Sequence, residues 1–410
     1  MLRLPIELLQ HIDGYLGNRD LLSLRLTCKE LEHSTFDHFA AEFLAYQYCS
    51  IHEVRDWTHL HDLFTRHSRL QRGIQEVGFI VSNPSSLSDP SCKSLDPLKF
   101  AGNIKDVLLN MDWSDGGKNA LSRVEDTYNS SLMVQVLRAV KSTGCLTWTE
   151  VEWQRFYYNL ESEDEKVNEL FSPVRRDFLL ALATVSLPIT TIELQTPTCG
   201  NFEDLLLMSG GQSLSIFGSV ETFDFETWFP THLLGHGAMD SDFRMATIIA
   251  ETACNMERFT LSLIHTDGFD AIDEESHANV VRIADDLLSC KGLDQLLALN
   301  LESVSLSLDA LFGILSRNKA SLGRLSLYYI CLFGPDDSWE QILRLISEMK
   351  DLSSLCLSSL ERGHERSYLR VRFPGTVEDW MVEWVFSDRH EVKRGLDAML
   401  DVGLEFTQEI

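Results

Sequence analysis

The side chains that most often perform catalysis or bind metals occur here without the spacing that such chemistry needs. His232 and His236 are four residues apart, which suits one helix face, but the adjacent glutamate of a zinc-protease helix is missing. His59 and His61 are two apart, so a helix would point them in different directions. These pairs indicate packing or surface histidines, and the sequence predicts no metal site.

Phosphate-binding and nucleophile motifs are also incomplete. Gly210-Gly211 is not followed by the Lys-Ser/Thr of a phosphate-binding loop, and Gly235-His-Gly237 lacks a third glycine at the required place. Ser213 and Ser215 are not flanked as in a nucleophile elbow. The 62 acidic residues will form some carboxylate pairs by chance. We therefore expect no catalytic residue and no cofactor, and we expect that the chain is not an enzyme.

Charge limits the classes of partner. The 410-residue chain carries a formal net charge of −27, whereas a nucleic-acid surface needs clustered lysine and arginine, so we expect no nucleic-acid partner. An acidic balance mildly favours basic partners, although the simpler explanation is that it only keeps a protein in solution.

Cysteines and apolar runs bear on location. The nine cysteines contain no Cys-x-x-Cys pair and are odd in number, which favours reduced thiols inside a cell. Glu7 and Asp13 interrupt what would have to be the apolar core of a signal peptide, and Pro188 breaks the charge-poor run 178–192. We expect no membrane partner and an intracellular location, in the cytoplasm, the nucleus or both.

The N-terminal stretch 4–44 predicts three amphipathic helices. Pro5 suits a first helical turn, and Gly17 is placed to end this helix in a left-handed turn. Asn18 is then a candidate N-cap for a second helix, and apolar residues at helical spacing over 36–44 predict a third. A unit this small has little interior, so part of its apolar surface must face a partner.

The residue identities in this stretch resemble an F-box, whose usual form is Leu-Pro-x-Glu-Leu-Leu, then Ile-x-x-Tyr-Leu, then Asp-Leu-Leu-x-Leu-Arg-Leu, then Cys-Lys. The chain differs at Gly14, at Gly17-Asn18 and at Leu31. An ordinary helical hairpin would explain the spacing but not these identities. The matching residues are Leu4, Pro5, Glu7, Leu8, Leu9, Ile12, Tyr15, Leu16, Asp20, Leu21, Leu22, Leu24, Arg25, Leu26, Cys28 and Lys29.

The resemblance implies the substrate-receptor subunit of an SCF-type cullin-RING ubiquitin ligase. Such a subunit docks on a Skp-type adaptor, and through it on cullin, while the rest of the chain holds an unknown protein target for ubiquitin transfer. The alternative is an interaction scaffold that binds the adaptor but acts outside ubiquitin transfer. The implied adaptor-binding residues are Leu4, Pro5, Leu8, Leu9, Ile12, Leu16, Leu21, Leu22, Leu26, Cys28 and Lys29.

The middle of the chain alternates between helix and strand patterns. Residues 46–70 predict a helical segment that leads to a strand at 74–81, and prolines 84, 90 and 97 mark 82–97 as a flexible Ser/Pro-rich loop. Further on, helices are expected at 133–140, 173–187, 243–254 and 274–290, with strands at 189–194, 259–263 and 297–301.

The C-terminal third contains a repeat, Leu-x-x-Leu-x-Leu-x-x-(apolar), whose copies begin at positions 296, 322 and 352. A helix is expected between copies, with Ser338 and Gln341 as its capping box. The three copies are Leu296, Leu299, Leu301 and Val304; Leu322, Leu325, Leu327 and Ile330; and Leu352, Leu355, Leu357 and Leu360. Weaker copies are Met256, Phe259, Leu261 and Ile264, and Ile74, Val77 and Phe79.

One strand and one helix in each copy of this length resembles a leucine-rich repeat. The family's usual Asn is replaced by Val304, Ile330 and Leu360, and an irregular α/β domain is the alternative. The expected fold class is α+β or α/β, with a three-helix F-box domain at 1–45 followed by an irregular leucine-rich-repeat-like α/β solenoid at 46–410. Taken whole, the chain resembles large fungal F-box families.

If the repeat strands stack, their alternation assigns each side chain to a face. Leucines of the motif would point into the core, and Asn300, Ser326 and Cys356 would lie along the opposite sheet face. These three are the candidate target-binding residues. The target could instead use loops or the segment 82–97.

Overall fold

The structure is a computed structural model whose chain forms two compact units. Unit 1 comprises Met1–Thr149 and Asn159–Pro188, and unit 2 comprises Glu150–Tyr158 and Ile189–Ile410. Each unit is taken by itself. The structure describes residues 12, 15–44, 46–50, 54–66, 74, 76–80, 130–140, 146–151, 178, 181–182, 184–196, 213–229, 238–265, 274–363, 367–370, 383–402 and 405–408.

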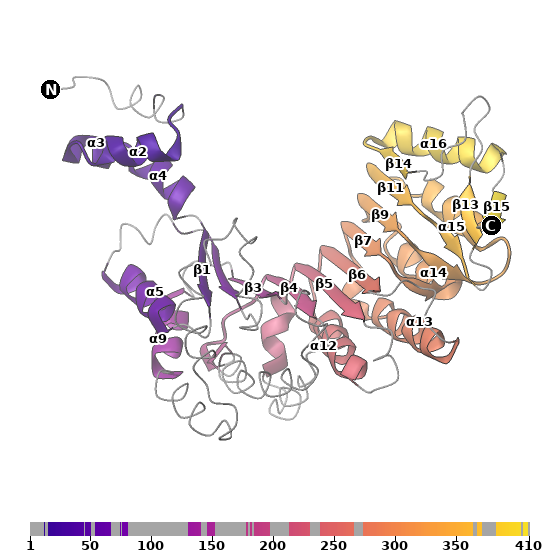
Figure 1. The fold of residues 1–410 in the computed structure, drawn as a ribbon, viewed down its shortest axis with the longest axis horizontal. Coiled ribbons are helices and arrows are strands. Elements are labelled where there is room, and N and C mark those ends of the chain that lie inside the picture. The colour runs from indigo at the N-terminus through magenta and orange to yellow at the C-terminus, as the bar shows by residue number, and fades with distance from the viewer. Residues whose placement is uncertain are drawn as a thin grey trace, which may run out of the picture. The chain divides into compact units, whose positions relative to one another are not determined.

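Unit 1 contains three short helices near its N-terminal end: α2 (Asn18–Arg25), α3 (Lys29–Ser34) and α4 (Phe36–Phe43) (Figure 1). The helices pack on one another, and Leu21, Leu31, Phe36 and Ala40 are buried among them. The third predicted helix, over 36–44, is confirmed by α4.

The helix boundaries correct the sequence-based expectation. Gly17 has φ −69° and is the N-cap of α2, so it is not a left-handed helix end, and Asn18 is the first residue of the helix rather than its cap. The second helix ends at Arg25, and Cys28 is the N-cap of a separate helix, α3. The reason is local: Thr27 donates its hydroxyl and its amide to the carbonyl of Leu24, which closes a turn there.

The rest of unit 1 combines β1 (Tyr46–Ser50), α5 (Val54–Arg66), β2 (Glu76–Ile80), α9 (Ser130–Val140) and β3 (Leu146–Val151), of which residues 146–149 belong to this unit. The strands lie parallel in the order β1-β2-β3. Trp57 stacks on Phe79 with ring centroids 5.3 Å apart, and Phe178 lies 5.1 Å from Phe79, so an aromatic cluster fills the space between α5 and the strands.

The strand predicted at 74–81 and the helix predicted at 133–140 are confirmed. The expectation that 46–70 is helical throughout is wrong, because 46–50 is strand β1. The loop expected at 82–97 lies outside the described residues.

Unit 2 is built on one main sheet. Its strands, in spatial order, are β4 (Thr191–Thr196), β5 (Thr222–Phe229), β6 (Arg258–His265), β7 (Ala298–Glu302), β9 (Arg324–Tyr328), β11 (Ser354–Ser358) and β14 (Glu383–Phe386). Every neighbouring pair is parallel except β11 and β14, which are antiparallel.

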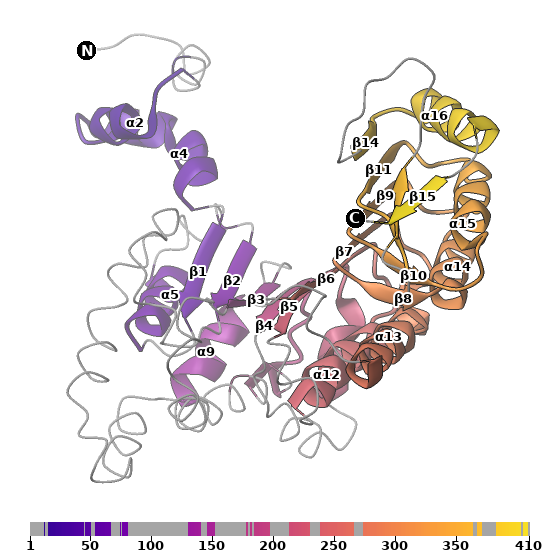
Figure 2. The same ribbon diagram turned by 45° about the vertical axis from the view of Figure 1, so that its right-hand side comes forward.

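Helical segments connect the strands of unit 2. They are the 3₁₀ segments η5 (Ser213–Ser219) and η8 (Lys291–Leu293) and the helices α12 (Ala238–Thr252), α13 (Glu274–Leu288), α14 (Leu308–Arg317), α15 (Ser338–Ser347) and α16 (Arg389–Val402). Both Figure 1 and Figure 2 show α12, α13, α14 and α15 along one side of the main sheet. The fold is therefore mixed α/β with a largely parallel sheet.

The leucines of the repeat form rows across the strands. Leu299, Leu325 and Leu355 are in register on β7, β9 and β11, and all three are buried. Leu301, Leu327 and Leu357 form the next buried row. The prediction that these three strands are neighbours in one parallel sheet is confirmed.

Each repeat strand ends in the same backbone turn. Ser303, Tyr329 and Ser359 adopt φ of 54°, 51° and 50°, in the left-handed region that few side chains favour. After this turn the chain enters a second sheet, made by β8 (Ser305–Ser307), β10 (Cys331–Phe333), β12 (Glu361–Arg362), β13 (Ser367–Arg370) and β15 (Glu405–Gln408). A buried apolar residue lies between each turn and the following strand, at the position where a leucine-rich repeat usually has Asn. These residues are Val304, Ile330 and Leu360.

A repeated hydrogen-bond motif joins successive coils of unit 2, where a coil means one strand of the main sheet together with the chain that leads to the next strand. One carbonyl accepts two consecutive backbone amides of the next coil. The accepting residues are Thr190, Glu221, Glu257, Leu297 and Gly323. Their spacing is closest from Leu297 to Gly323 and widest from Glu257 to Leu297, so the coils keep one connection although their lengths vary.

Asn318, directly after α14, is a buried polar side chain that ties two coils together. Its Oδ1 accepts from the Leu296 amide at 2.7 Å, and its Nδ2 donates to the carbonyls of Leu293 at 2.6 Å and Ile314 at 2.9 Å. The side chain thus satisfies backbone groups that would otherwise be buried without partners.

The capping box expected at Ser338 and Gln341 is wrong, because the N-cap of α15 is Asp337 and the Ser338 hydroxyl donates to the Pro335 carbonyl instead.

Within the described ranges, every helix is too short or too polar to cross a bilayer.

Candidate binding surfaces

Unit 1 exposes large apolar side chains around α2. Leu26 is 88% exposed, Tyr15 is 78% exposed, and Leu22 and Ile12 are each more than 40% exposed. Scattered apolar residues are normal on a protein surface, but these four all fall within the short stretch 12–26. The region around α2 is therefore the candidate docking surface of unit 1.

Arg25 fixes the orientation of α2 against the other two helices. Its guanidinium donates to the Glu32 carbonyl and to the Glu32 carboxylate, both at 3.0 Å, and lies 3.9 Å from the centroid of the Phe39 ring. A planar guanidinium can make these contacts together, which a lysine could not. This local arrangement holds α2 in place while Leu22 and Leu26 stay at the surface.

The residues that the F-box resemblance implied for adaptor binding fall into three groups. Ile12, Leu22, Leu26, Cys28 and Lys29 are exposed, and Leu16 is partly exposed. Leu21 is fully buried, so it supports the helices rather than offering surface. Leu4, Pro5, Leu8 and Leu9 lie outside the described residues. Direct adaptor contact by any of these side chains stays a prediction.

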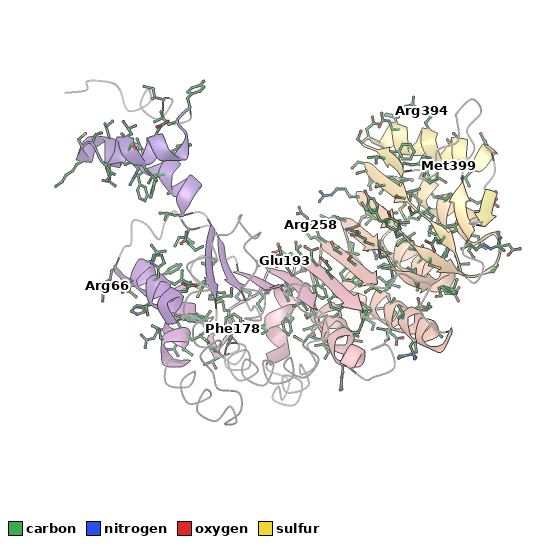
Figure 3. The ribbon with its side chains drawn as sticks, in the orientation of Figure 1. Arg66, Phe178, Glu193, Arg258, Arg394 and Met399 are labelled. Atoms are coloured by element: carbon green, nitrogen blue, oxygen red, sulfur yellow. The ribbon has the colours of Figure 1, made fainter. Side chains whose placement is uncertain are left out.

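In unit 2 the candidate surface is the strand face, which we define as the side of the main sheet that carries Glu193, Asp224, Glu226, Thr260, Ser262, Asn300, Glu302, Ser326, Tyr328 and Cys356. These residues alternate with buried apolar residues along each strand. Figure 3 shows Glu193 and Arg258 on the side of the strands away from α12 and α13, which is the strand face.

The register brings together the three residues predicted for target binding. Asn300 lies opposite Ser326 on β9, and Ser326 lies opposite Cys356 on β11. Asn300 and Ser326 are partly exposed, whereas Cys356 is only 6% exposed and donates its thiol to the Tyr328 hydroxyl at 2.7 Å. The three residues share one row, and their role in target binding stays a prediction.

The sequence did not single out the neighbouring row, Glu226, Ser262 and Glu302, which crosses β5, β6 and β7 in register. Ser262 is 4% exposed, and its hydroxyl has no hydrogen-bond partner among the described residues. The same holds for Oδ1 of Asn300. The signal that could have found Ser262 is the weak repeat copy containing Phe259 and Leu261, because it places residue 262 on the strand face.

Metal chemistry has no support in the part of the chain that the structure describes. No three side chains of histidine, cysteine, aspartate or glutamate gather there in a group that could hold an ion.

Burial controls the chemistry of the cysteines. Burial is the main cause that raises the pKa of the Cys290 thiol to about 12, and nearby Glu251 adds to it. Burial and then the charge of Glu361 raise the pKa of Cys331 to about 12 as well. Cys28 and Cys254 are exposed.

We therefore expect an alkylating reagent at pH 8 to label Cys28 and Cys254 in the native chain while Cys290 and Cys331 stay unlabelled. With a pKa near 12, roughly one buried thiol in ten thousand is ionised at pH 8, and the thiolate is the reacting form. Peptide mass spectrometry before and after denaturation measures each site. Rapid native labelling of Cys331 would contradict the burial.

The same shift links unfolding to pH. Between about pH 8.5 and 12 the unfolded chain releases these thiol protons first, so the free energy of unfolding should fall as the pH rises through that range.

Comparison with known proteins gives a family for the N-terminal segment. Residues 1–40 match the model of the F-box-like family. A comparison with curated proteins gave no match. F-box domains generally bind Skp-type adaptors. The family match and the packed helices α2, α3 and α4 together identify residues 1–40 as an F-box-like domain.

Proposed function

We propose that this protein is the non-catalytic substrate-receptor subunit of an SCF-type cullin-RING ubiquitin ligase. The supporting observation is the F-box-like domain with apolar side chains exposed around α2, including Leu22 and Leu26. An exposed apolar surface of this kind is stabilised when a partner covers it. The partner is a Skp-type adaptor, and cullin binds through that adaptor.

In this proposal unit 2 is a leucine-rich-repeat-like solenoid that holds the protein target. Its support is the parallel register of β4 to β11 and the return of the chain through a helical segment between successive strands of this range. Solenoids of stacked coils commonly bind partners on an extended sheet surface. The subunit then accelerates ubiquitin transfer by proximity, because it raises the effective concentration of target lysines near a separate conjugating enzyme.

The double variant Leu22→Ala with Leu26→Ala tests adaptor docking. Burial of a leucine side chain contributes roughly 1.5–3 kcal/mol, so the pair should contribute at least about 2 kcal/mol, or roughly a thirtyfold change in the dissociation constant. The measurement is the affinity of the purified full chain for a Skp-type adaptor.

Phe312→Ala is the matched control, because Phe312 on α14 is as exposed as Leu22. It should leave adaptor affinity unchanged. Undiminished binding by a folded Leu22→Ala, Leu26→Ala variant would refute docking through this surface. If the chain binds the adaptor but never co-purifies with cullin, it acts as a scaffold outside ubiquitin transfer.

A further inference from the structure

The strand face of unit 2 contains a row of acceptor groups on three neighbouring strands. Ser262 lies opposite Glu226 on one side and opposite Glu302 on the other. Neighbouring parallel strands are about 4.8 Å apart, so the two glutamates flank Ser262 with their Cα atoms roughly 10 Å from each other. Leu261 and Leu263 are fully buried on the opposite side of β6, so the Ser262 side chain lies on the strand face, in the same row as the two glutamates.

Two buried polar atoms at this place have no hydrogen-bond partner among the described residues. They are Oγ of Ser262, in a side chain that is 4% exposed, and Oδ1 of Asn300, which is the diagonal neighbour of Ser262 on β7. A buried polar atom without a hydrogen bond destabilises a fold, because it has lost its contacts with water and gained none in return. Two such atoms on the same face of the sheet point to a ligand that supplies the missing hydrogen bonds.

The chemistry of the row limits what that ligand can be. A carboxylate and an amide oxygen only accept hydrogen bonds, and a hydroxyl can accept as well as donate. A group that donates several hydrogen bonds and carries positive charge would satisfy Asn300 and Ser262 and pair with Glu302. Lysine ammonium and arginine guanidinium groups are the protein side chains with these properties.

We propose that Glu226, Ser262, Glu302 and Asn300 form a site that binds a lysine or arginine side chain of a partner protein. Charge complementarity commits the site to a basic segment. The strand face also carries two cations, Arg258 at the amino end of β6 and Arg324 at the amino end of β9. Arg258 lies two rows from Ser262, and Arg324 lies two rows from Glu302. Identifying this partner as the ligase target rests on the proposed function, whereas the chemistry of the site does not.

Selection from a random peptide library tests the site. The bait is the full chain in complex with its adaptor, or the full chain alone if no adaptor binds. Wild type should enrich lysine or arginine at one peptide position. Glu302→Lys should abolish that enrichment and favour aspartate or glutamate, and Glu302→Gln should weaken a selected peptide by roughly tenfold or more, since the negative charge that pairs with the basic side chain is lost.

Asp351→Lys is the matched control. It makes the same change of charge at an exposed carboxylate outside the strand face, and it should leave the selection unchanged. If wild type enriches no basic residue, or if Glu302→Lys selects the same peptides as wild type, the proposal is overturned. Loss of enrichment on adding a chelator would also overturn it, because the acceptors would then be metal ligands.

Ser262→Ala separates binding from folding. Removing an unsatisfied buried hydroxyl should raise the melting temperature slightly, by roughly 2–4 °C, while it weakens the selected peptide. A structural role for Ser262 predicts the opposite change in melting temperature. If the chain selects basic peptides but binds no adaptor, the ligase function is refuted and this site remains supported. If the chain binds the adaptor but selects no basic peptide, this site is refuted and the ligase function remains supported.

Discussion

Replacing Leu325 with aspartate should unfold unit 2. Leu325 lies in the middle of the buried row on β7, β9 and β11, between Leu299 and Leu355, and has almost no exposed surface. A carboxylate there would have no hydrogen-bond donor in an apolar layer, so it must be buried without a partner or push the strands apart. The expected loss exceeds about 4 kcal/mol, a large part of the roughly 5–15 kcal/mol that stabilises a typical domain.

Thermal and denaturant unfolding of the full chain, together with limited proteolysis, would show the loss. Ser326→Asp is the control, because the next residue on the same strand lies on the strand face and is partly exposed. It should leave the unfolding transition nearly unchanged. A folded, protease-resistant Leu325→Asp chain would be incompatible with the buried row.

The second large effect is expected for Asn318→Ala. The substitution leaves the Leu296 amide and the Leu293 carbonyl without their side-chain partner in a buried place. Each unsatisfied backbone group costs about 1–3 kcal/mol, and the lost packing adds to this, so the free energy of unfolding should fall by roughly 3–5 kcal/mol.

Asn300→Ala offers the same change of side chain where the amide Oδ1 has no partner among the described residues. It should change the free energy of unfolding by less than about 1 kcal/mol. Equal losses for the two variants, measured by denaturant unfolding, would show that the contacts of Asn318 do not stabilise the fold.

The repeat and the F-box-like helices could be predicted because their signals are local and redundant. In the repeat, leucines such as Leu325 and Leu327 recur at fixed spacing on strands that are buried on one side, so period and burial coincide. In the F-box-like helices, residue identities carried more information than spacing. The parallel neighbours β7, β9 and β11 followed from the first signal, and the exposed leucines Leu22 and Leu26 agree with the second.

Other features depend on contacts between coils and leave little trace in a single sequence. β1 carries no aliphatic residue over Tyr46–Ser50, so its pairing with β2 decides its conformation. Nothing in the sequence distinguishes Asn318 from the other asparagines, because its hydrogen bonds to Leu293 and Leu296 form only in the folded chain. The spacing of the repeat suggested an irregular fold before residue 296. The carbonyls of Thr190, Glu221 and Glu257 nevertheless each accept two consecutive amides, and the sequence does not show this because any residue supplies these backbone groups.

The antiparallel strand β14 has a consequence for self-association. A parallel sheet of similar coils presents at its last strand the same hydrogen-bonding edge as at every earlier one, so a coil of another molecule could continue it. β14 reverses direction beside β11, and α16 packs against α15 and β14 at the same end. A neighbouring molecule that offers a parallel coil meets a mismatched edge and a helix there. The growth of end-to-end filaments from this edge is thereby stopped within the chain itself.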